Sequence, residues 1–488
     1  MSLFQKLFKQ TFIYGLATVL PRMLSFILVP LYTQVMPTGS YGEVTLIFAW
    51  FAIFNVVLAY GMETAFFRFY NSEKNKTGVI STSLVSLMGT TALFTVFALI
   101  FQDRLALLLN IDGQFIKYVI FILALDALAI IPFALLRAKQ NPQRYAVIKI
   151  LNVAINLSLN VFFLLILPGL AKGNTEGLTG MLYIPDFEIS YIFISNLIAS
   201  GFTLLLISPS YKLPSYKFDR VLWSKMIRYG LPVMIAGIAF TINEVFDRIM
   251  LSELLPSAIA KSEIGKYSAC YKIALFMTLF ATAFRLGIEP FFFSHSRSEN
   301  PQRAYAQITN YFVVLGSVIL LAVVVYSDLL KVLIVRNSDY WEAMPVVPII
   351  VLASFCLGIY HNLSVWYKVT DRTRFGAYIS IAGAIITIAI NYLFIPSIGY
   401  YASAYATLAA YASMMFISYY FGRKYYPIPY NFRKIGFYMG ISILFSALSF
   451  YVFNGNILIG SLLLLVFLLL VYKMEYDLLK RIFIRNES

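Results

Sequence analysis

The 488-residue chain has few charged residues, only two cysteines and only two histidines. Charged residues make up 12% of the chain and hydrophobic residues 60%, a ratio that excludes an ordinary water-soluble globular protein. Cys270 and Cys356 lie inside apolar stretches, and we interpret them as small core residues rather than a disulfide. His295 and His361 have no cysteine or carboxylate at metal-ligand spacing, so we expect no metal site.

The chain also lacks the motifs of nucleotide-driven or hydrolytic chemistry. No Walker A sequence, dinucleotide fingerprint or nucleophile elbow occurs, and we predict no catalytic residue and no cofactor. The longest segment that we predict outside the membrane on the external side, residues 169–186, is too short to form a folded domain of its own. Any transport must therefore be driven by an ion gradient, by the membrane potential or by the gradient of the substrate.

Long apolar stretches are what the sequence has in abundance. A helix needs about 20 mostly apolar residues to cross the hydrocarbon core of a bilayer. Fourteen stretches reach or approach that length: residues 11–35, 43–66, 79–101, 115–137, 144–168, 187–208, 226–252, 264–290, 307–328, 343–367, 374–396, 398–421, 434–453 and 456–473. The sequence therefore predicts an all-α polytopic membrane protein with fourteen transmembrane helices.

The positions of the basic residues predict the orientation in the membrane. Most of the 38 Lys and Arg fall in the two termini and in every second loop, and basic loops stay on the cytoplasmic side. Both termini should therefore be cytoplasmic, with residue 175 external and residue 215 internal. Loops that face anionic headgroups account for the net charge of +15, so we expect no nucleic acid partner.

Short motifs recur in the same order in the two halves of the chain. They are YGL at residues 14–16 and 229–231, GME and GIE at residues 61–63 and 287–289, and AIN at residues 154–156 and 389–391. Such a repeat predicts two parallel six-helix lobes around a central cavity. The N-terminal lobe would span residues 1–221 and the C-terminal lobe residues 222–431, with helices 13 and 14 and a cytoplasmic tail in residues 432–488.

The opening residues 14–42 and the block at residues 229–232, followed by Asp247 and Arg248, resemble prokaryotic polysaccharide or oligosaccharide flippases. These proteins belong to the multidrug/oligosaccharidyl-lipid/polysaccharide exporter superfamily, and the resemblance covers essentially the whole chain. It implies a flippase of the bacterial inner membrane that works by alternating access. The substrate would be an undecaprenyl-pyrophosphate-linked oligosaccharide, moved from the cytoplasmic to the periplasmic leaflet for surface polysaccharide biosynthesis, lipopolysaccharide included. The implied partners are this polyprenyl-linked substrate, membrane lipid and other polysaccharide assembly proteins.

Cationic residues inside the predicted spans are candidate substrate contacts. Arg22 lies in the middle of the first span beside Pro21, and its guanidinium fork matches phosphate oxygens. We predict that Arg22 binds the pyrophosphate, assisted by Lys272 or Arg248. Glu244 precedes Arg248 by one helical turn, so these two side chains could instead neutralise each other.

Acidic residues inside the predicted spans are candidate ion-coupling groups. Asp126 lies mid-span with no charged neighbour within a turn, and Glu63 lies at the end of its span. Either carboxylate could take up H⁺ or Na⁺, or could pair with Arg22. Lys149 lies about one turn from the cytoplasmic face, and we expect it to extend to that interface.

Two other functions fit parts of this pattern. A cation-coupled drug or metabolite exporter of the same superfamily would use Asp126 and Glu63 as its core. A polytopic lipid-sugar transferase or polymerase would need larger external loops than those predicted here.

Overall fold

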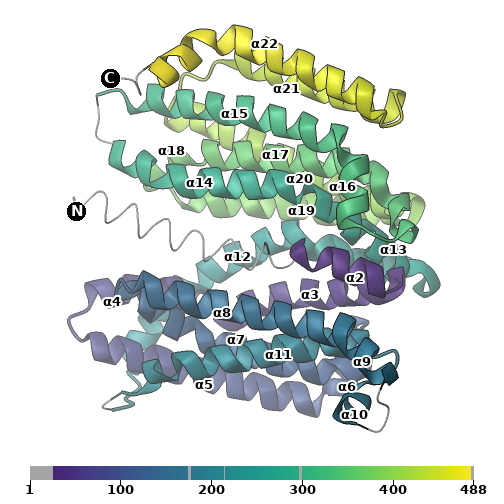
Figure 1. The fold of residues 1–488 in the computed structure, drawn as a ribbon. Coiled ribbons are helices and arrows are strands. Elements are labelled where there is room, and N and C mark those ends of the chain that lie inside the picture. The colour runs from purple at the N-terminus through teal and green to yellow at the C-terminus, as the bar shows by residue number, and fades with distance from the viewer. Residues whose placement is uncertain (1–22, 24–25, 174–176, 214, 296–298, 485–488) are drawn as a thin grey trace. The chain divides into compact units, whose positions relative to one another are not determined.

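The computed structural model describes residues 23, 26–173, 177–213, 215–295 and 299–484 (Figure 1). Across these ranges the chain is helical and contains no β-strand. Helices satisfy their own backbone hydrogen bonds, as a chain that crosses lipid must. Twelve helical segments are long and apolar enough to span a membrane. The protein is therefore a multi-pass membrane protein.

These twelve segments coincide with twelve of the fourteen predicted spans. The first predicted span, residues 11–35, lies largely outside the described ranges, which contain its end as α2 (Val29–Val35). The span predicted at residues 398–421 forms α20, a 26-residue helix rich in tyrosine, serine and alanine and therefore only weakly apolar. A total of fourteen crossings stays a prediction.

The chain divides into two compact units. Unit 1 comprises residues 1–268 and 387–400, and unit 2 comprises residues 269–386 and 401–488. The lobe boundaries predicted from the repeat, after residues 221 and 431, stay predictions.

The elements up to residue 271 begin and end as follows: α2 (Val29–Val35), α3 (Thr38–Ala59), α4 (Met62–Ser72), α5 (Lys76–Ile100), α6 (Gln102–Leu109), α7 (Gly113–Ala138), α8 (Pro142–Val161), η1 (Phe162–Ile166), α9 (Leu167–Gly173), α10 (Leu178–Leu182), α11 (Glu188–Ile207), η2 (Ser208–Tyr211), α12 (Arg220–Leu254) and α13 (Ser257–Tyr271). The later elements are η3 (Lys272–Ala274), α14 (Leu275–His295), α15 (Pro301–Val325), α16 (Ser327–Ile334), η4 (Ser338–Val346), α17 (Val347–Leu363), α18 (Val365–Val369), α19 (Arg374–Ile398), α20 (Tyr400–Tyr425), α21 (Phe432–Ala447), η5 (Leu448–Val452) and α22 (Ile457–Ile484).

The central helix of unit 1 is α7. It packs against α3, α5 and α11, and α8 packs against both α11 and α7. Protein surrounds α7 on several faces, which explains why its sequence is apolar nearly all round. Phe115, Ile122 and Phe193 belong to the hydrophobic cluster at this centre. A charged group near the middle of α7, such as Asp126, is therefore surrounded by other helices of unit 1.

The central helix of unit 2 is α17, which packs against α14, α15 and α21. Phe312 of α15 stacks on Phe280 of α14, with ring centroids 5.1 Å apart. Both cysteines are buried and unbonded to each other, and Cys270 donates a hydrogen bond from Sγ to the Tyr340 carbonyl. Aromatic rings thus fill much of the space between these helices.

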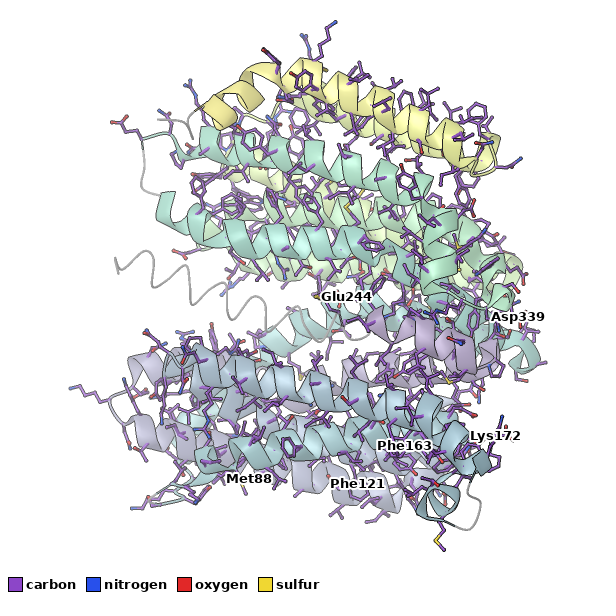
Figure 2. All side chains as sticks on the ribbon, viewed as in Figure 1. Met88, Phe121, Phe163, Lys172, Glu244 and Asp339 are labelled. Atoms are coloured by element: carbon purple, nitrogen blue, oxygen red, sulfur yellow. The ribbon has the colours of Figure 1, made fainter. Side chains whose placement is uncertain are left out.

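The outer faces of the helices are apolar. Leu93 of α5 and Leu458 of α22 are 72% and 79% exposed, as expected for side chains that face lipid. Figure 2 labels Met88 of α5 and Phe121 of α7, two further apolar side chains that are exposed on unit 1. Because the exposed helix faces are apolar, we expect a site for polar groups inside each unit.

Candidate functional site

Asp126 is a carboxylate near the middle of α7, inside unit 1. Ser200 of α11 donates a hydrogen bond of 2.8 Å from its hydroxyl to Oδ1 of Asp126. The charged group that acts on it is Lys149 of α8, at electrostatic range. Among the described residues Asp126 forms no direct ion pair. A carboxylate held by a neutral hydroxyl can gain a proton without breaking a salt bridge.

Lys149 of α8 contacts groups on α7, and its extension to the cytoplasmic interface stays a prediction. Its ammonium lies 4.3 Å from the centroid of the Phe133 ring, a cation–π contact with the neighbouring helix α7. It also interacts electrostatically with Asp126 and with Arg137. The sequence analysis did not identify this ring or this carboxylate as neighbours of Lys149.

Glu63, at the start of α4, forms an ion pair with Arg137 near the end of α7. The guanidinium of Arg137 also lies 4.8 Å from the centroid of the Phe67 ring. Glu63, Arg137, Lys149 and Asp126 thus form a series of interacting charges, here called the charged series. It contains two acids and two bases on three helices, and Asp126 is the one acid in it that is bonded to a hydroxyl.

Arg248 lies in α12 and is buried in unit 1. Its Nη1 lies 2.8 Å from Oδ1 of Asp247 and donates a second hydrogen bond to the Glu244 carbonyl. Tyr267 of α13 donates a 2.7 Å hydrogen bond to the other carboxylate oxygen of Asp247. Arg248 therefore sits in a built polar cluster, with its charge balanced by Asp247.

The other two predicted substrate contacts are Lys272 and Arg22. Lys272 lies in the short 3₁₀ turn η3 between α13 and α14, half-buried in unit 2. Arg22 lies outside the described residues. The structure therefore brings Asp126 and Glu63 into one charged series, keeps Arg248 in a separate cluster of unit 1, and places Lys272 in unit 2.

Asparagines cross-link helices at the two copies of the repeated AIN motif. Tyr32 of α2 donates 2.9 Å to Oδ1 of Asn160, and Nδ2 of Asn160 reaches Oδ1 of Asn156, both on α8. In the second copy, Thr387 of α19 donates 3.0 Å to Oδ1 of Asn243 on α12. Asn391 in turn donates to the Thr387 carbonyl. Buried amides with partners on another helix fix how the helices are aligned.

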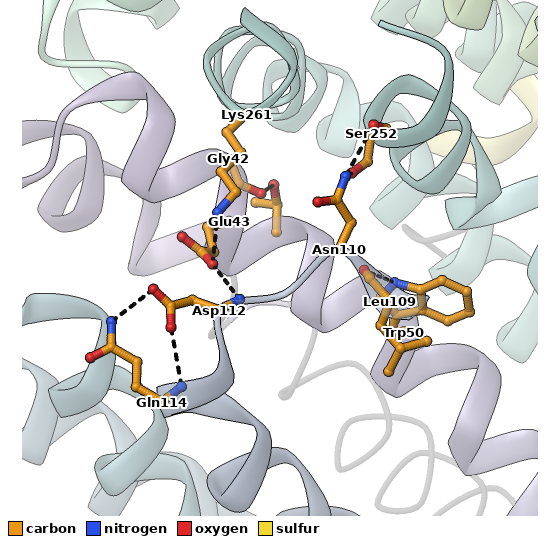
Figure 3. Close-up of polar contacts among 10 residues, drawn as sticks. Gly42, Glu43, Trp50, Leu109, Asn110, Asp112, Gln114, Ser252 and Lys261 are labelled. Carbon is orange, nitrogen blue, oxygen red and sulfur yellow. Dashed lines mark hydrogen bonds and ion pairs between the residues drawn. The ribbon is translucent and has the colours of Figure 1, made fainter. Parts of the chain in front are cut away.

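Two glycines allow α3 and α13 to touch through their backbones. A Cβ atom on Gly42 would lie 1.7 Å from the Lys261 carbonyl oxygen, and one on Gly265 would lie 1.9 Å from the Thr38 carbonyl oxygen. Polar contacts surround this approach (Figure 3). The Lys261 ammonium pairs with Glu43 at 3.0 Å, and Glu43 also accepts from the backbone N–H of Asp112. Side chains of any size are excluded at the two glycines.

Several of these groups were missed by the sequence analysis. Ser200 carries no signal in a list of ionisable residues, and Arg137, the last residue of the predicted span 115–137, was not singled out. The recurring AIN motif did carry a signal for Asn156 and Asn391, although it was used there only as evidence of a repeat. The part of the chain that the structure describes contains no group of three or more His, Cys, Asp or Glu residues able to hold a metal ion.

The chain matches two sequence families. The model of the family described as polysaccharide biosynthesis protein matches residues 7–284, more than half of the chain. A model named MatE matches residues 232–393. No curated protein sequence matches the chain.

The fold is similar to that of solved transporters. The lipid II flippase MurJ, in an inward closed conformation, has a TM-score of 0.74 at 14% identity, covering 96% of this chain and 100% of MurJ. An inward-facing multidrug resistance MATE family transporter of the MOP superfamily has a TM-score of 0.66 at 12% identity, covering 83% and 94%. A MATE transporter from Vibrio cholerae has a TM-score of 0.59 at 13% identity, covering 86% and 96%. The resemblance that the sequence predicted is confirmed, and these relatives are transporters and flippases rather than enzymes.

Proposed function

Because the chain belongs to the polysaccharide biosynthesis protein family, we propose that it is a flippase for a polyprenyl-pyrophosphate-linked oligosaccharide. It would move this substrate from the cytoplasmic to the periplasmic leaflet of a bacterial inner membrane, as a step of surface polysaccharide assembly. The family match over residues 7–284 is the observation that carries the proposal. The likeness of the fold to a lipid II flippase supports it.

The proposed mechanism is alternating access. The sugars cross through a hydrated cavity while the polyprenyl tail stays in lipid, and the pyrophosphate is bound by Arg22 with Lys272 or Arg248. Arg248 is already balanced by Asp247, so phosphate oxygens would have to compete with that carboxylate. Arg22 and Lys272 are therefore the stronger candidates for direct contact with the substrate.

The charged series favours H⁺ over Na⁺ as the coupling ion. A sodium ion at Asp126 would be repelled by the ammonium of Lys149, which interacts with the same carboxylate. A proton adds no second cation to the site, because it neutralises Asp126 and keeps the hydrogen bond to Ser200 available. Glu63, already paired with Arg137, would transmit the change in charge rather than bind the ion.

A second candidate function is supported by the MatE match over residues 232–393. In that case the protein would export an amphipathic drug or metabolite in exchange for a cation, and Asp126 and Glu63 would form its core. The two functions differ in the substrate that moves: a lipid-linked oligosaccharide in the first case and a small amphipathic molecule in the second.

Reconstituted proteoliposomes distinguish these functions. A fluorescent polyprenyl-pyrophosphate oligosaccharide in the outer leaflet is tested for protection from an impermeant quencher, and ethidium is tested in parallel for gradient-driven movement. Protection of the lipid-linked sugar without movement of ethidium is the expected result. Movement of ethidium alone would replace the flippase by an exporter.

Substitutions of Arg22 test the phosphate anchor. Arg22→Lys keeps the charge without the fork and should retain part of the flipping activity, whereas Arg22→Ala should lose most of it at normal membrane expression. A charge-assisted bidentate contact contributes on the order of 2 kcal/mol. If the double variant Arg22→Gln/Asp126→Asn recovers the activity that either single variant loses, then Arg22 is a partner of Asp126 and not an anchor.

A further inference from the structure

A hollow of about 640 Å³ lies in unit 2, where α15 begins, α20 ends and α21 begins. Arg303 and Arg423 line it, together with the amide side chains of Asn300 and Gln302 and the ring of Tyr419. Among the described residues, no carboxylate lines it. We call it the basic hollow. Its size falls within the range of about 300–1,000 Å³ that is typical of sites for small ligands.

The two arginines of the basic hollow lack the partners that other cations of unit 2 have. Lys368 pairs with Glu289 at 2.7 Å and Lys434 pairs with Glu475 at 2.6 Å. Arg303 and Arg423 form no ion pair and no hydrogen bond within the described ranges. Two guanidinium groups that line one hollow repel each other unless an anion lies between them.

The wall of the basic hollow is a defined structure. Pro427 and Pro429 fix the backbone of the segment between α20 and α21, and Tyr430 donates a backbone hydrogen bond of 2.9 Å to the Ile428 carbonyl. The Tyr430 ring also packs against Tyr419, with ring centroids 6.3 Å apart. The surface that faces the arginines is thus held in place without a ligand.

We propose that the basic hollow binds the phosphate group of an anionic ligand, with Arg303 and Arg423 as its two charged contacts. Guanidinium forks bind tetrahedral phosphate oxygens in pairs, and the amides of Asn300 and Gln302 supply further donors. The start of α15 adds the partial positive charge of a helix N-terminus.

Two sources of phosphate fit this chemistry. The predicted topology places the hollow on the cytoplasmic side, where the leaflet carries anionic phospholipid headgroups and the solution carries free phosphate. Neither source depends on what the protein transports. The proposal of an anion site can therefore be correct or wrong whether or not the protein is a flippase.

The test measures the thermal stability of the full-length protein in a neutral detergent. Short-chain phosphatidylglycerol, short-chain phosphatidylcholine and inorganic phosphate at matched ionic strength are added separately to the wild type, to R303Q/R423Q and to R374Q/R433Q. The last variant is the matched control, because it removes two exposed arginines of the same unit and predicted side that do not line the hollow.

We expect phosphatidylglycerol or phosphate, but not phosphatidylcholine, to raise the Tm of the wild type and of the control. In R303Q/R423Q the concentration needed for half of this rise should increase by about tenfold or more. A response to phosphatidylglycerol alone assigns the site to a lipid headgroup, and an equal response to inorganic phosphate assigns it to a soluble anion.

Two results would overturn the proposal: no anion-specific rise in the wild type, or an equal rise in R303Q/R423Q. If R303Q/R423Q does not fold, R303K/R423K takes its place, because it keeps both charges and loses both forks. The lysine variant should then need a higher anion concentration than the wild type, and an unchanged concentration would also sink the assignment.

Discussion

The helices of unit 1 and unit 2 are brought together in different ways. In unit 1, a Cβ atom on Gly42 would collide with a backbone carbonyl oxygen at 1.7 Å, whereas in unit 2 a Cβ atom on Gly316 would meet the Phe355 ring at 2.3 Å. The first neighbour is backbone and has no room to move, while the second is a side chain that can rotate. Unit 1 therefore contains a rigid backbone contact, and unit 2 is packed through aromatic side chains that can adjust.

One acid in each unit, Asp126 and Glu289, illustrates a second difference in bonding partners. Asp126 in unit 1 is held by the hydroxyl of Ser200, whereas Glu289 in unit 2 is paired with the Lys368 ammonium at 2.7 Å. Protonation of a directly paired carboxylate breaks an ion pair, whereas protonation of a hydroxyl-bonded one does not. We therefore expect ion coupling at Asp126 in unit 1 and a structural role for Glu289 in unit 2.

The largest expected effect separates these two acids. Asp126→Asn should lower gradient-driven transport by at least about tenfold, equivalent to ~1.4 kcal/mol, while substrate binding stays measurable. Glu289→Gln should keep its response to the gradient. Transport by proteoliposomes with and without an imposed pH gradient measures both. Unchanged transport by Asp126→Asn would show that Asp126 does not couple an ion. The proposed functional difference between Asp126 and Glu289 would then be wrong.

The next effect concerns the glycines. Gly42→Ala should destabilise the protein by about 3 kcal/mol, because backbone must move, and Gly316→Ala by about 1 kcal/mol, because the Phe355 ring can rotate. Gly39→Ala in the same helix as Gly42 is the control, since nothing lies within 4 Å of its Cβ position. Thermal unfolding in detergent ranks the three variants. If Gly42→Ala and Gly316→Ala lower the stability equally, then the backbone contact of unit 1 accommodates a methyl group as readily as the aromatic packing of unit 2.

Buried tyrosines give a smaller effect that sharpens the comparison. Tyr438→Phe in unit 2 removes a 2.8 Å hydrogen bond to the Glu475 carboxylate, which should cost about 2 kcal/mol. Tyr32→Phe in unit 1 removes a 2.9 Å bond to the neutral Asn160 amide and should cost about 1 kcal/mol. The same unfolding assay measures both losses, and the reverse order would contradict the view that the acids of unit 2 hold its structure.

The smallest effect is expected at Glu63. Its ion pair with Arg137 is partly open to solvent, with side-chain exposures of 43% and 32%. Glu63→Gln should therefore change the stability by no more than about 0.5 kcal/mol. Glu73→Gln, an acid of the same region without an ion pair in the described structure, provides the baseline. A loss well above that of Glu73→Gln would mean that the charged series acts as one cooperative network.

The sequence predicted the spanning helices wherever composition alone decides. It predicted α7 and α15 because a stretch of about twenty mostly apolar residues has few other structures available in lipid. The boundaries of the compact units could not be read in this way, since contacts between distant helices decide them.

The partners of the candidate residues were harder to predict than the residues themselves. Asp126 and Glu63 stood out because carboxylates are rare inside spans, but Ser200 lies 74 positions away from Asp126 and is an ordinary residue in its own helix. The Phe133 ring beside Lys149 could not be predicted, because the distance to the membrane surface says nothing about neighbouring helices. Candidate site residues can be identified from a sequence by their type, whereas their bonding partners depend on how the helices pack.

Burial of the two cysteines has a practical consequence for mapping this protein. Cys270 and Cys356 are 0% and 4% exposed, so water-soluble thiol reagents should leave the native chain unlabelled. A single cysteine introduced into a loop would then be the sole target of a membrane-impermeant maleimide. The unlabelled wild-type protein thus serves as the negative control. The side of the membrane on which each loop lies can be determined without first removing a native cysteine.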